Sequence, residues 1–592
     1  MAAAGYSIPR RSPGWLYGAA TDLLLGAGLA YLLSVPLLVS LAAGFGIADW
    51  SLEATLLLGL AISTPHYGAT LLRVYGRADD RRRYAFFAWW ISAGLLFWFA
   101  AGLHSALLGS AFVTLYFAWS PWHFAGQNYG LALMFLRRRG VEVAPGPKRC
   151  LYAAFGVSWL ITLLVFQSGS PAPAFAPDFS TGQVDYEVLR VGIPTRLAAL
   201  WAPLLVLAYA GLLAAAAVGL RRAGAGARDL ALPGLLALTQ SMWFMVPACA
   251  AVWGQRIQGL AFTEVWASIA HSIQYLWVTS YHARRADAST RLLPYYGRAV
   301  LAGCAIQAVP ALVFAPYLLG TVSWTGGLGI LVFSFVNLHH FVLDGAVWKL
   351  RDGAVARLLL RGDAAGAPSP RAPASGLGRG PRALLWAVGV ASLCIALLEL
   401  WDARAARSDD LARVEAAARR LAWVGRERVA VLGRLGDLYD ARGSRERAEA
   451  TWRHALSLRR DPAVLNNLAW QLSVRPGADP GRAAEAVALA EEAVASYGPD
   501  DYVSLDTLAA AYAAAGRFDD ARRVGERALS LARADRAEMT PRLESRLALY
   551  RAGRPYRVGP GVGPGVGPGV GSGLGPEAGP GADRAGGAEG GS

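Results

Sequence analysis

Cysteine is scarce in this sequence, and cysteine pairs at metal-binding spacing are missing. Four cysteines occur among the 592 residues, at Cys150, Cys249, Cys304 and Cys394, and each falls in or beside an apolar segment. None of them forms a CxxC pair. This pattern supports neither a disulfide framework nor a zinc cluster built on thiolates.

Charged residues are also sparse, which excludes an ordinary soluble enzyme. Only 17% of the residues are charged, whereas 54% are hydrophobic, and the mean hydropathy is +0.33. The apolar residues gather in blocks of about 20, the length that crosses the hydrocarbon core of a membrane. We therefore expect an integral membrane protein.

The positive charge of the chain is spread over short clusters. The net charge is +15, and the arginines lie between apolar blocks in stretches such as LRRRG and HARRADASTR. Such clusters are typical of cytoplasmic loops, so they indicate membrane topology and no nucleic-acid partner. No clear cleavage site follows Arg10 and Arg11, which favours a first membrane helix that is retained.

The apolar blocks predict an all-α fold, in which a polytopic bundle of about eleven transmembrane helices precedes a helical solenoid. The expected spans are residues 17 to 44, 50 to 73, 83 to 103, 105 to 136, 150 to 168, 195 to 221, 229 to 253, 260 to 283, 297 to 319, 325 to 347 and 382 to 401. Basic clusters follow the even-numbered spans. This alternation predicts a multi-pass cell-membrane protein whose N-terminus is cytoplasmic and whose C-terminal region is extracytoplasmic, or periplasmic in a Gram-negative inner membrane.

Composition divides the chain into five regions. Residues 1 to 362 form the expected ten-span core, residues 363 to 381 an Ala/Gly/Pro-rich linker, and residues 382 to 404 the last transmembrane helix. A repeat domain is expected over residues 405 to 555. Residues 556 to 592 are rich in glycine and proline, and we expect them to be disordered.

The expected soluble region repeats a pattern of small residues at helical spacing. Two segments share a small residue, a tyrosine three positions later, and alanines twelve and nineteen positions later (Gly436, Tyr439, Ala448 and Ala455; Ala509, Tyr512, Ala521 and Ala528). A third segment, from residue 468, has a longer middle turn. The pattern resembles the tetratricopeptide repeat family. The resemblance implies an α-solenoid with a concave surface for a protein partner.

Histidines recur at a similar depth in several expected spans. Seven of the eight lie in or beside spans, at His66, His104, His123, His271, His282, His339 and His340. All except His104 lie on the second, fourth, eighth and tenth spans, in the middle or the cytoplasmic half. An ionisable group in a membrane is costly and needs a partner or a role. We therefore expect one histidine cluster in the cytoplasmic half of the bundle.

The local sequences around the histidines favour a binding site. In STPHYG and SPWHFAG, a proline precedes the histidine and a glycine follows it, a combination that kinks a helix and admits a close neighbour. Helical spacing places Gln127 one turn after His123, and Asp344 one turn after His340. Polar side chains should therefore share a cavity with the histidines.

Neutral imidazoles beside a carboxylate suit Fe, Zn, Cu or Mn, and this donor set with open positions is typical of non-haem iron oxygenases. The predicted ligands of an Fe(II) ion are His66, His123, His271, His339 and His340, with Zn, Cu and Mn as alternatives. Asp344 is predicted to ligate the metal or to orient His340. Gln127, Asn128 and Gln274 are predicted to place oxygen or a polar group of a lipid-like substrate. Interhelical hydrogen bonding without a metal is the alternative.

The motifs TPHYG and WHFAGQ resemble the histidine motifs of the Brp/Blh family of membrane beta-carotene dioxygenases. The resemblance implies non-haem iron, molecular oxygen and a lipophilic polyene substrate. It touches His66 and His123 directly, and His271 or His340 would match later histidines of the family. The sequence has no HxxxH pair, which argues against the histidine-box desaturases and hydroxylases.

Two other classes of protein remain open. Ten or eleven spans followed by an external tetratricopeptide domain resemble some membrane glycosyltransferases that use polyprenyl-linked sugars. Asp49 and Glu53 would then be the acidic residues of the first external loop. A proton-coupled transporter or envelope scaffold would instead use the histidines and Asp344 as a proton relay or as bundle contacts, and an internal duplication would fit a transporter.

Overall fold

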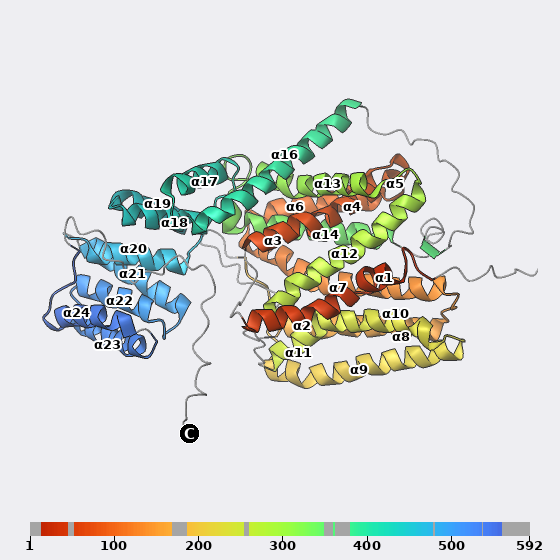
Figure 1. Ribbon diagram of the computed structural model, residues 1–592, viewed down its shortest axis with the longest axis horizontal. Helices are drawn as coiled ribbons and strands as arrows, with labels where there is room; N and C mark the ends of the chain where they lie inside the picture. The colour runs from red at the N-terminus through yellow and green to blue at the C-terminus, as the bar shows by residue number, and fades with distance from the viewer. Residues whose placement is uncertain are drawn as a thin grey trace, which may run out of the picture. The chain divides into compact units, whose positions relative to one another are not determined.

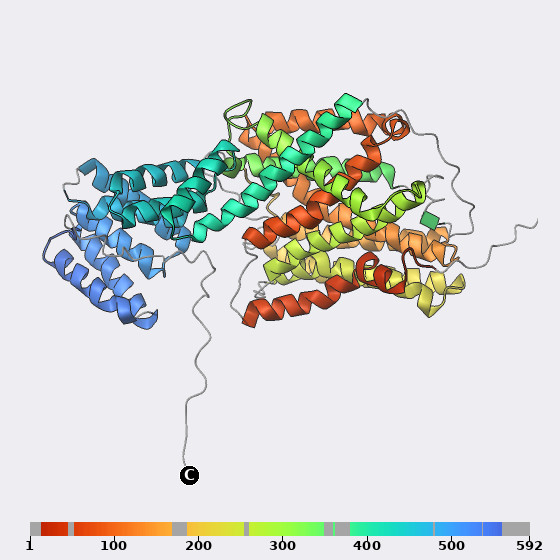
Figure 2. The same ribbon diagram turned by 45° about the horizontal axis from the view of Figure 1, so that its top comes forward.

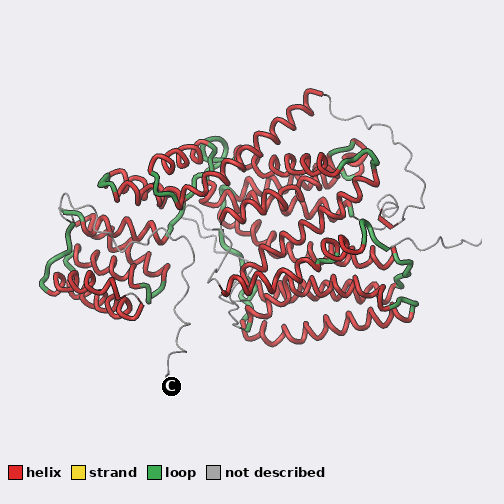
Figure 3. The backbone as a smooth tube through the Cα atoms, in the orientation of Figure 1, coloured by secondary structure: helices red, strands yellow, loops and turns green. Residues whose placement is uncertain are grey.

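The computed structural model of the chain describes residues 14–44, 52–168, 186–253, 260–348, 359–360, 379–476, 480–535 and 537–558. Within these residues the fold is all-helical, as expected, and contains no strand (Figure 3). Ser168 and Ile193 form one isolated parallel bridge. The chain separates into two compact units, which divide between Leu400 and Trp401.

The first unit contains the helices up to α14 and most of α16 (Figure 1). Their bounds are α1 (Ala19–Thr21), α2 (Leu29–Gly44), α3 (Leu52–Leu58), α4 (Thr64–Tyr75), α5 (Ala78–Arg83), α6 (Ser92–Gly102), α7 (Ala106–Arg138), α8 (Pro145–Phe166), α9 (Thr195–Arg222), α10 (Ala227–Gln240), α11 (Val246–Val252), α12 (Leu260–Ala286), α13 (Leu292–Val313), α14 (Gly329–Val347) and α16 (Arg379–Ala403). Short π-helical turns lead into α4 and α11. In contrast, α7 continues through Pro121 as a single helix.

Several helices of the described residues are long and apolar enough to cross a membrane. Six segments meet this condition: Pro145–Phe166, Thr195–Arg222, Ala227–Val252, Leu292–Val313, Trp324–Val347 and Gly380–Arg407. A bent pair, Ala19–Gly26 with Leu29–Leu41, makes a seventh when it counts as one span. The expected second span is not among these segments, and the third is described only as a shorter apolar helix, Phe86–Gly102. The expected fourth and eighth spans, α7 and α12, are not among them either. Both carry histidine and amide side chains in mid-helix, which lower their hydropathy.

Two helices, α7 and α12, lie between two groups of helices in the first unit (Figures 1 and 2). On one side are α4, α6, α13 and α14, and on the other are α8, α9, α10 and α11. Contacts join α7 to α6 and α14 on one side and to α8 and α10 on the other, while α12 contacts α2, α4 and α13. The helices α4, α7, α12 and α14 therefore surround one common region inside the first unit.

Two glycines allow α4 and α13 to pack backbone against backbone. A Cβ atom on Gly68 would lie 1.7 Å from the carbonyl oxygen of Ala299, and one on Gly303 would lie 1.9 Å from that of Thr64. No side chain fits at either position, so these glycines set the helix separation. The contact holds α4, the helix that carries His66, in place.

The second unit contains α17 (Leu411–Trp423), α18 (Val429–Ala441), α19 (Arg445–Leu458), α20 (Pro462–Val474), α21 (Pro480–Tyr497), α22 (Tyr502–Ala514), α23 (Phe518–Asp535) and α24 (Thr540–Arg551). Consecutive helices pack against each other, α18 on α19, α20 on α21, and α22 on α23. The small residues of the repeated sequence pattern lie at these contacts. A Cβ atom on Gly436 would come within 2.3 Å of the Trp452 indole nitrogen, and Ala448, Ala455, Ala509, Ala521 and Ala528 are fully buried.

Parts of the regions predicted from composition lie outside the described residues. The expected linker, residues 363 to 381, is described only from Arg379, where α16 begins. The expected disordered tail, residues 556 to 592, is described only as far as Val558. Tyr556 packs against Trp470 of α20, and the Val558 amide donates to the Val474 carbonyl, so these first tail residues are ordered against the second unit.

Candidate metal site

Four of the predicted histidines meet inside the first unit, and each comes from a different helix. His66 lies on α4, His123 on α7, His271 on α12 and His340 on α14. The ring centroids of His66 and His340 lie 4.2 Å apart, those of His123 and His340 4.9 Å, and those of His66 and His271 5.0 Å. The structure therefore contains a histidine cluster built from the four helices that the sequence predicted.

Three of the four imidazoles are buried, and all four keep a buried nitrogen without a hydrogen-bond partner among the described residues. His66, His271 and His340 expose at most 2% of their surface. Among the described residues, the Nε2 atoms of all four histidines have no hydrogen-bond partner, and Nδ1 of His271 has none either. Buried polar atoms are nearly always satisfied in folded proteins. Several unsatisfied nitrogens in one place could therefore take a ligand such as a metal ion.

Two groups of three side chains could hold a metal ion, and the groups share His340. One consists of His66, His271 and His340, and the other of His123, His340 and Asp344. The ligand atoms within each group lie within 4.8 Å of one another. Opposite ligands of an ion lie about 4.2 Å apart when each bond is about 2.1 Å long, so small side-chain movements would close either group around an ion. The buried donor set fits a metal ion.

Hydroxyl groups engage the second nitrogen of two of these histidines. The Oγ1 atom of Thr70 lies 2.8 Å from Nδ1 of His340, and the Oγ atom of Ser272 lies 3.4 Å from Nδ1 of His66. A metal-ligating histidine usually forms such a contact through its other nitrogen, because the contact fixes the ring orientation and the tautomer. Nε2 is consequently the nitrogen that each ring offers to a ligand.

Asp344 is buried beside the histidines and has one oxygen engaged by hydroxyl groups. Its Oδ1 atom accepts hydrogen bonds from Tyr275 at 2.6 Å and from Thr70 at 3.3 Å. Its Oδ2 atom lies 3.5 Å from Nε2 of His340 and 3.9 Å from Nε2 of His123. Asp344 thus presents Oδ2 to the cluster, where it can serve as a metal ligand or orient an imidazole.

Sequence reasoning missed the two hydroxyl residues that hold Asp344. Neither Thr70 nor Tyr275 is among the site residues predicted from the sequence. Each follows a cluster histidine by four residues, Thr70 after His66 and Tyr275 after His271. Residues four apart share one face of a helix, so this spacing was the available signal.

The three predicted amides form a network that reaches the cavity at one end. Gln127 donates to the side-chain oxygen of Gln274, and Gln274 donates to Oδ1 of Asn128 at 3.1 Å. Asn128 in turn donates to Gln240 at 2.9 Å. Gln127 lines the cavity beside the cluster, whereas Asn128 and Gln274 do not. Their amides connect α7, α10 and α12.

The other histidines of the first unit lie apart from both ligand groups. His339, predicted as a metal ligand, has its Nε2 atom 3.2 Å from the Tyr75 hydroxyl and its ring stacked on Phe335. Neighbouring residues on a helix point about 100° apart, so His339 and His340 face different surroundings. His282 packs against Trp348, and His104 is exposed.

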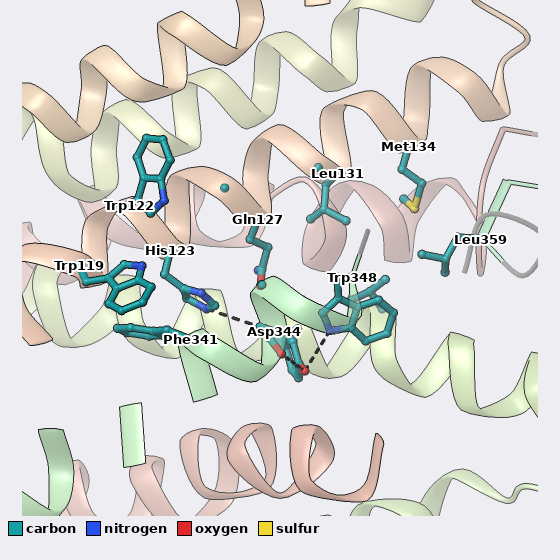
Figure 4. Close-up of a pocket in the computed structure, with 15 residues that line it drawn as sticks. Trp119, Trp122, His123, Gln127, Leu131, Met134, Phe341, Asp344, Trp348 and Leu359 are labelled. Carbon is teal, nitrogen blue, oxygen red and sulfur yellow. Dashed lines mark hydrogen bonds and ion pairs between the residues drawn. The ribbon is translucent and has the colours of Figure 1, made fainter. Parts of the chain in front are cut away.

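A cavity of about 300 Å³ opens beside His123 and Asp344 (Figure 4). Its walls are mainly aromatic and aliphatic. Trp119 and Phe341 lie at the end near His123, and Met134 lies toward the other end. A volume of this size with a few convergent polar groups is typical of a site for a small molecule.

The structure does not describe the side chains of the two acids that a glycosyltransferase would use. Asp49 lies outside the described residues, and so does the side chain of Glu53. The site that the structure describes is the histidine cluster with its cavity.

Comparison of the chain with protein-family models, curated proteins and solved structures finds no match. The resemblances to the tetratricopeptide repeat family and to the Brp/Blh family therefore stay predictions. Function has to be argued from the geometry of the site.

Proposed function

We propose that this chain is an integral membrane protein with a metal centre held by His66, His123, His271 and His340. Asp344 is the fifth ligand or the group that orients His340. The observation that carries the proposal is the convergence of four imidazoles whose buried Nε2 atoms lack hydrogen-bond partners among the described residues. Histidines that merely joined helices by hydrogen bonds would have these nitrogens satisfied.

The contacts of His340 favour a single ion. His340 belongs to both ligand groups, but Thr70 engages its Nδ1 atom. Nε2 is then the one nitrogen that His340 can give to a metal. One ion that draws ligands from both groups uses this nitrogen once, whereas two ions would compete for it.

The reaction that we propose is oxygenase-like and acts on a lipophilic substrate. Imidazole and carboxylate donors of this kind would suit non-haem iron. Bound Fe(II) would supply the capacity to activate molecular oxygen. The chain's own residues do the rest: Thr70 and Tyr275 hold Asp344, Gln127 offers a polar group, and the aromatic walls exclude water.

We further propose that the chain crosses the membrane in about eleven spans with a cytoplasmic N-terminus. The six apolar segments support this proposal, as does α7, whose 33 residues extend over ~50 Å. The second unit is proposed to be a tetratricopeptide-type solenoid outside the cytoplasm that binds a protein partner. Its support is the packing of consecutive helices through buried small residues at the repeated positions.

A proton-coupled transporter is the second candidate. It is favoured by the buried titratable groups of the first unit: Tyr275 donates to Asp344, and Oδ2 of Asp344 lies 3.5 Å from Nε2 of His340. Chains of acidic and histidine side chains can carry protons. A relay alone does not explain why four imidazoles leave Nε2 unsatisfied. The metal centre explains both the histidines and the carboxylate.

Metal analysis of the detergent-purified full-length chain tests the proposal. We expect about one metal ion per chain in the wild type and loss of this ion in His66→Ala, His123→Ala and His340→Ala, because each variant removes a ligand. His104→Ala is the matched control, since His104 is exposed and lies apart from the cluster. Folded wild-type protein that contains no metal, even after incubation with Fe(II) or Zn(II), would contradict the proposal.

A further inference from the structure

The cavity beside the metal site is elongated and follows α7. Its lining residues on this helix include Trp119, His123, Gly130 and Met134, at the spacing of one helix face. From Trp119 to Met134 the helix rises ~22 Å at ~1.5 Å per residue. His123 lies one turn from Trp119, so the cavity extends along α7 on both sides of His123. A volume of about 300 Å³ over this length is a slot rather than a chamber.

Three glycines give this slot its depth. Gly126 and Gly130 of α7 and Gly345 of α14 line it, and a Cβ atom on any of them would meet no heavy atom of the described chain within 4 Å. Gly68 and Gly303, in contrast, face a neighbouring backbone. A glycine inside a helix costs about 0.5–1 kcal/mol relative to alanine. At the three slot positions no packing contact of the described chain requires this cost, and the space above them is room for a ligand.

The polar side chains that line the slot lie between its two ends. His123, Asp344 and Gln127 lie between Trp119 at one end and Met134 toward the other (Figure 4). Both ends are apolar. A ligand that fills the slot is therefore apolar at both ends and passes the metal ligands between them.

We propose that the slot binds a single extended hydrocarbon chain, acyl or prenyl, and that an internal position of this chain lies at the metal site. Gly126, Gly130 and Gly345 are the specificity-determining residues, because any side chain there would occupy the path of the ligand. The assignment of a reacting position rests on the proposed function. Binding of the hydrocarbon itself depends only on the slot and does not require a metal.

Two of the three glycines, Gly126 and Gly130, also have a spacing that is common where membrane helices pack against each other. Gly126 and Gly130 form a GxxxG pair, which is common where two transmembrane helices meet. Two features favour the ligand: Gly345 comes from a different helix, and all three glycines border a hollow that continues to unsatisfied histidine nitrogens. Self-association through this pair is an outcome that the experiment must detect.

Photolabelling of the full-length protein in lipid nanodiscs tests the proposal. One probe is palmitic acid with a mid-chain diazirine, and the other is geranylgeraniol with a diazirine. Labelled peptides are mapped by mass spectrometry in the wild type, Gly130→Leu and Gly211→Leu. Gly211 is the matched control, because it lies within α9, does not line the slot, and has open space at its Cβ position.

We expect at least one probe to label α7 and α14 in the wild type and in Gly211→Leu, with labelling about tenfold weaker in Gly130→Leu because leucine fills the slot. The probe that labels the protein shows whether the slot prefers an acyl or a prenyl hydrocarbon. Equal labelling in Gly130→Leu overturns the proposal, and so does a changed oligomeric mass with unchanged labelling. Metal content measured on the same samples separates this result from the proposed function: metal without slot labelling overturns the slot alone.

Discussion

The two ring nitrogens of His340 have different surroundings, and this difference shapes the site. Nδ1 lies beside the Thr70 hydroxyl, whereas Nε2 has no hydrogen-bond partner within the described chain and lies 3.5 Å from Asp344. Thr70 also donates to Asp344. One small hydroxyl side chain thus contacts both His340, which the two candidate ligand groups share, and the carboxylate beside it.

Thr70→Val should weaken metal binding while leaving every proposed ligand in place. Loss of the hydroxyl frees the ring and tautomer of His340, and the loss of such outer contacts typically costs about 10–100-fold in metal affinity. Competition with a chelator measures this change. Thr162→Val is the control, since the buried Thr162 hydroxyl bonds the Ser158 carbonyl in α8. Equal metal affinity in Thr70→Val and wild type would show that Thr70 does not position the ligand.

Asp437 of α18 should make the stability of the second unit depend on pH. Burial raises the pKa of Asp437 to about 6, although hydrogen bonds from Asn467 and Trp452 and the nearby Arg434 lower it. The folded-state pKa exceeds the unfolded value of about 3.9. The stability that the protonated carboxyl contributes is therefore complete below pH ~4 and is lost as the pH rises through ~6.

The variant Asp437→Asn should remove this dependence, because its amide stays neutral. The difference in unfolding free energy between wild type and variant should change by roughly 3 kcal/mol at most between pH 4 and pH 7, with the wild type losing stability as the pH rises. Hydrogen exchange of α18 peptides in the full-length chain measures it. A constant difference over this range would contradict the assignment.

At the scale of helices, glycine has two opposite roles in the first unit. Gly68 and Gly303 are pressed against a neighbouring backbone, whereas Gly126 and Gly130 border open space. The first pair sets the distance between α4 and α13. The second pair leaves room in the slot. The same residue type thus serves packing in one place and binding in the other, and the surroundings distinguish them.

Gly303→Ala should destabilise the contact between α4 and α13. The new Cβ atom would lie 1.9 Å from the Thr64 carbonyl oxygen, so the helices must move apart, and overpacking of this kind costs about 1–3 kcal/mol or more. We expect a lower thermal midpoint and a reduced metal content, because His66 moves with α4. Gly211→Ala should leave both unchanged. A variant as stable as the wild type would show that the helices separate at no cost.

The ion pair between α22 and α24 should stabilise the second unit only when both partners are present. Arg546 lies 2.7 Å from Asp506, both are buried, and the Arg546 guanidinium also lies 5.0 Å from the centre of the Trp470 ring. Arg546→Leu leaves a buried carboxylate without its cation, at a cost of about 3–5 kcal/mol.

The double variant Asp506→Leu with Arg546→Leu should recover much of this loss, because it removes the stranded charge as well. Hydrogen exchange of α22 in the full-length chain compares the wild type, both single variants and the double variant. If the double variant is as unstable as the sum of the two single variants, the pair makes no coupled contribution.

At the scale of the whole molecule, the arginine clusters predict which exposed segments lie on each side of the membrane. The segment that follows α12 should be cytoplasmic, and the second unit should be extracytoplasmic. In a background without native cysteines, Ser457→Cys places a thiol on exposed α19, and Ser289→Cys places one in the exposed segment that follows α12. A membrane-impermeant maleimide should label Ser457→Cys in intact cells and Ser289→Cys only after the membrane is opened. The reverse pattern would invert the proposed topology.

Much of the site could be predicted because its signals are local. A histidine in an apolar helix is visible in the sequence, and the spacing of four between His340 and Asp344 places them on one helix face. The division between His339 and His340 could not be predicted. Both are buried on α14, and only the packing of neighbouring helices decides that His340 faces His66 while His339 faces Tyr75.

By itself, the sequence determined that the chain is helical and apolar and that four helices carry the histidines, because hydropathy and helical periodicity are properties of neighbouring residues. The tertiary structure decided which nitrogens remain free, that Thr70 and Tyr275 hold Asp344, and that Gly126, Gly130 and Gly345 border one slot. These features join residues that are distant in the chain. Their contacts arise from the packing of α4, α7, α12 and α14, which no local pattern specifies.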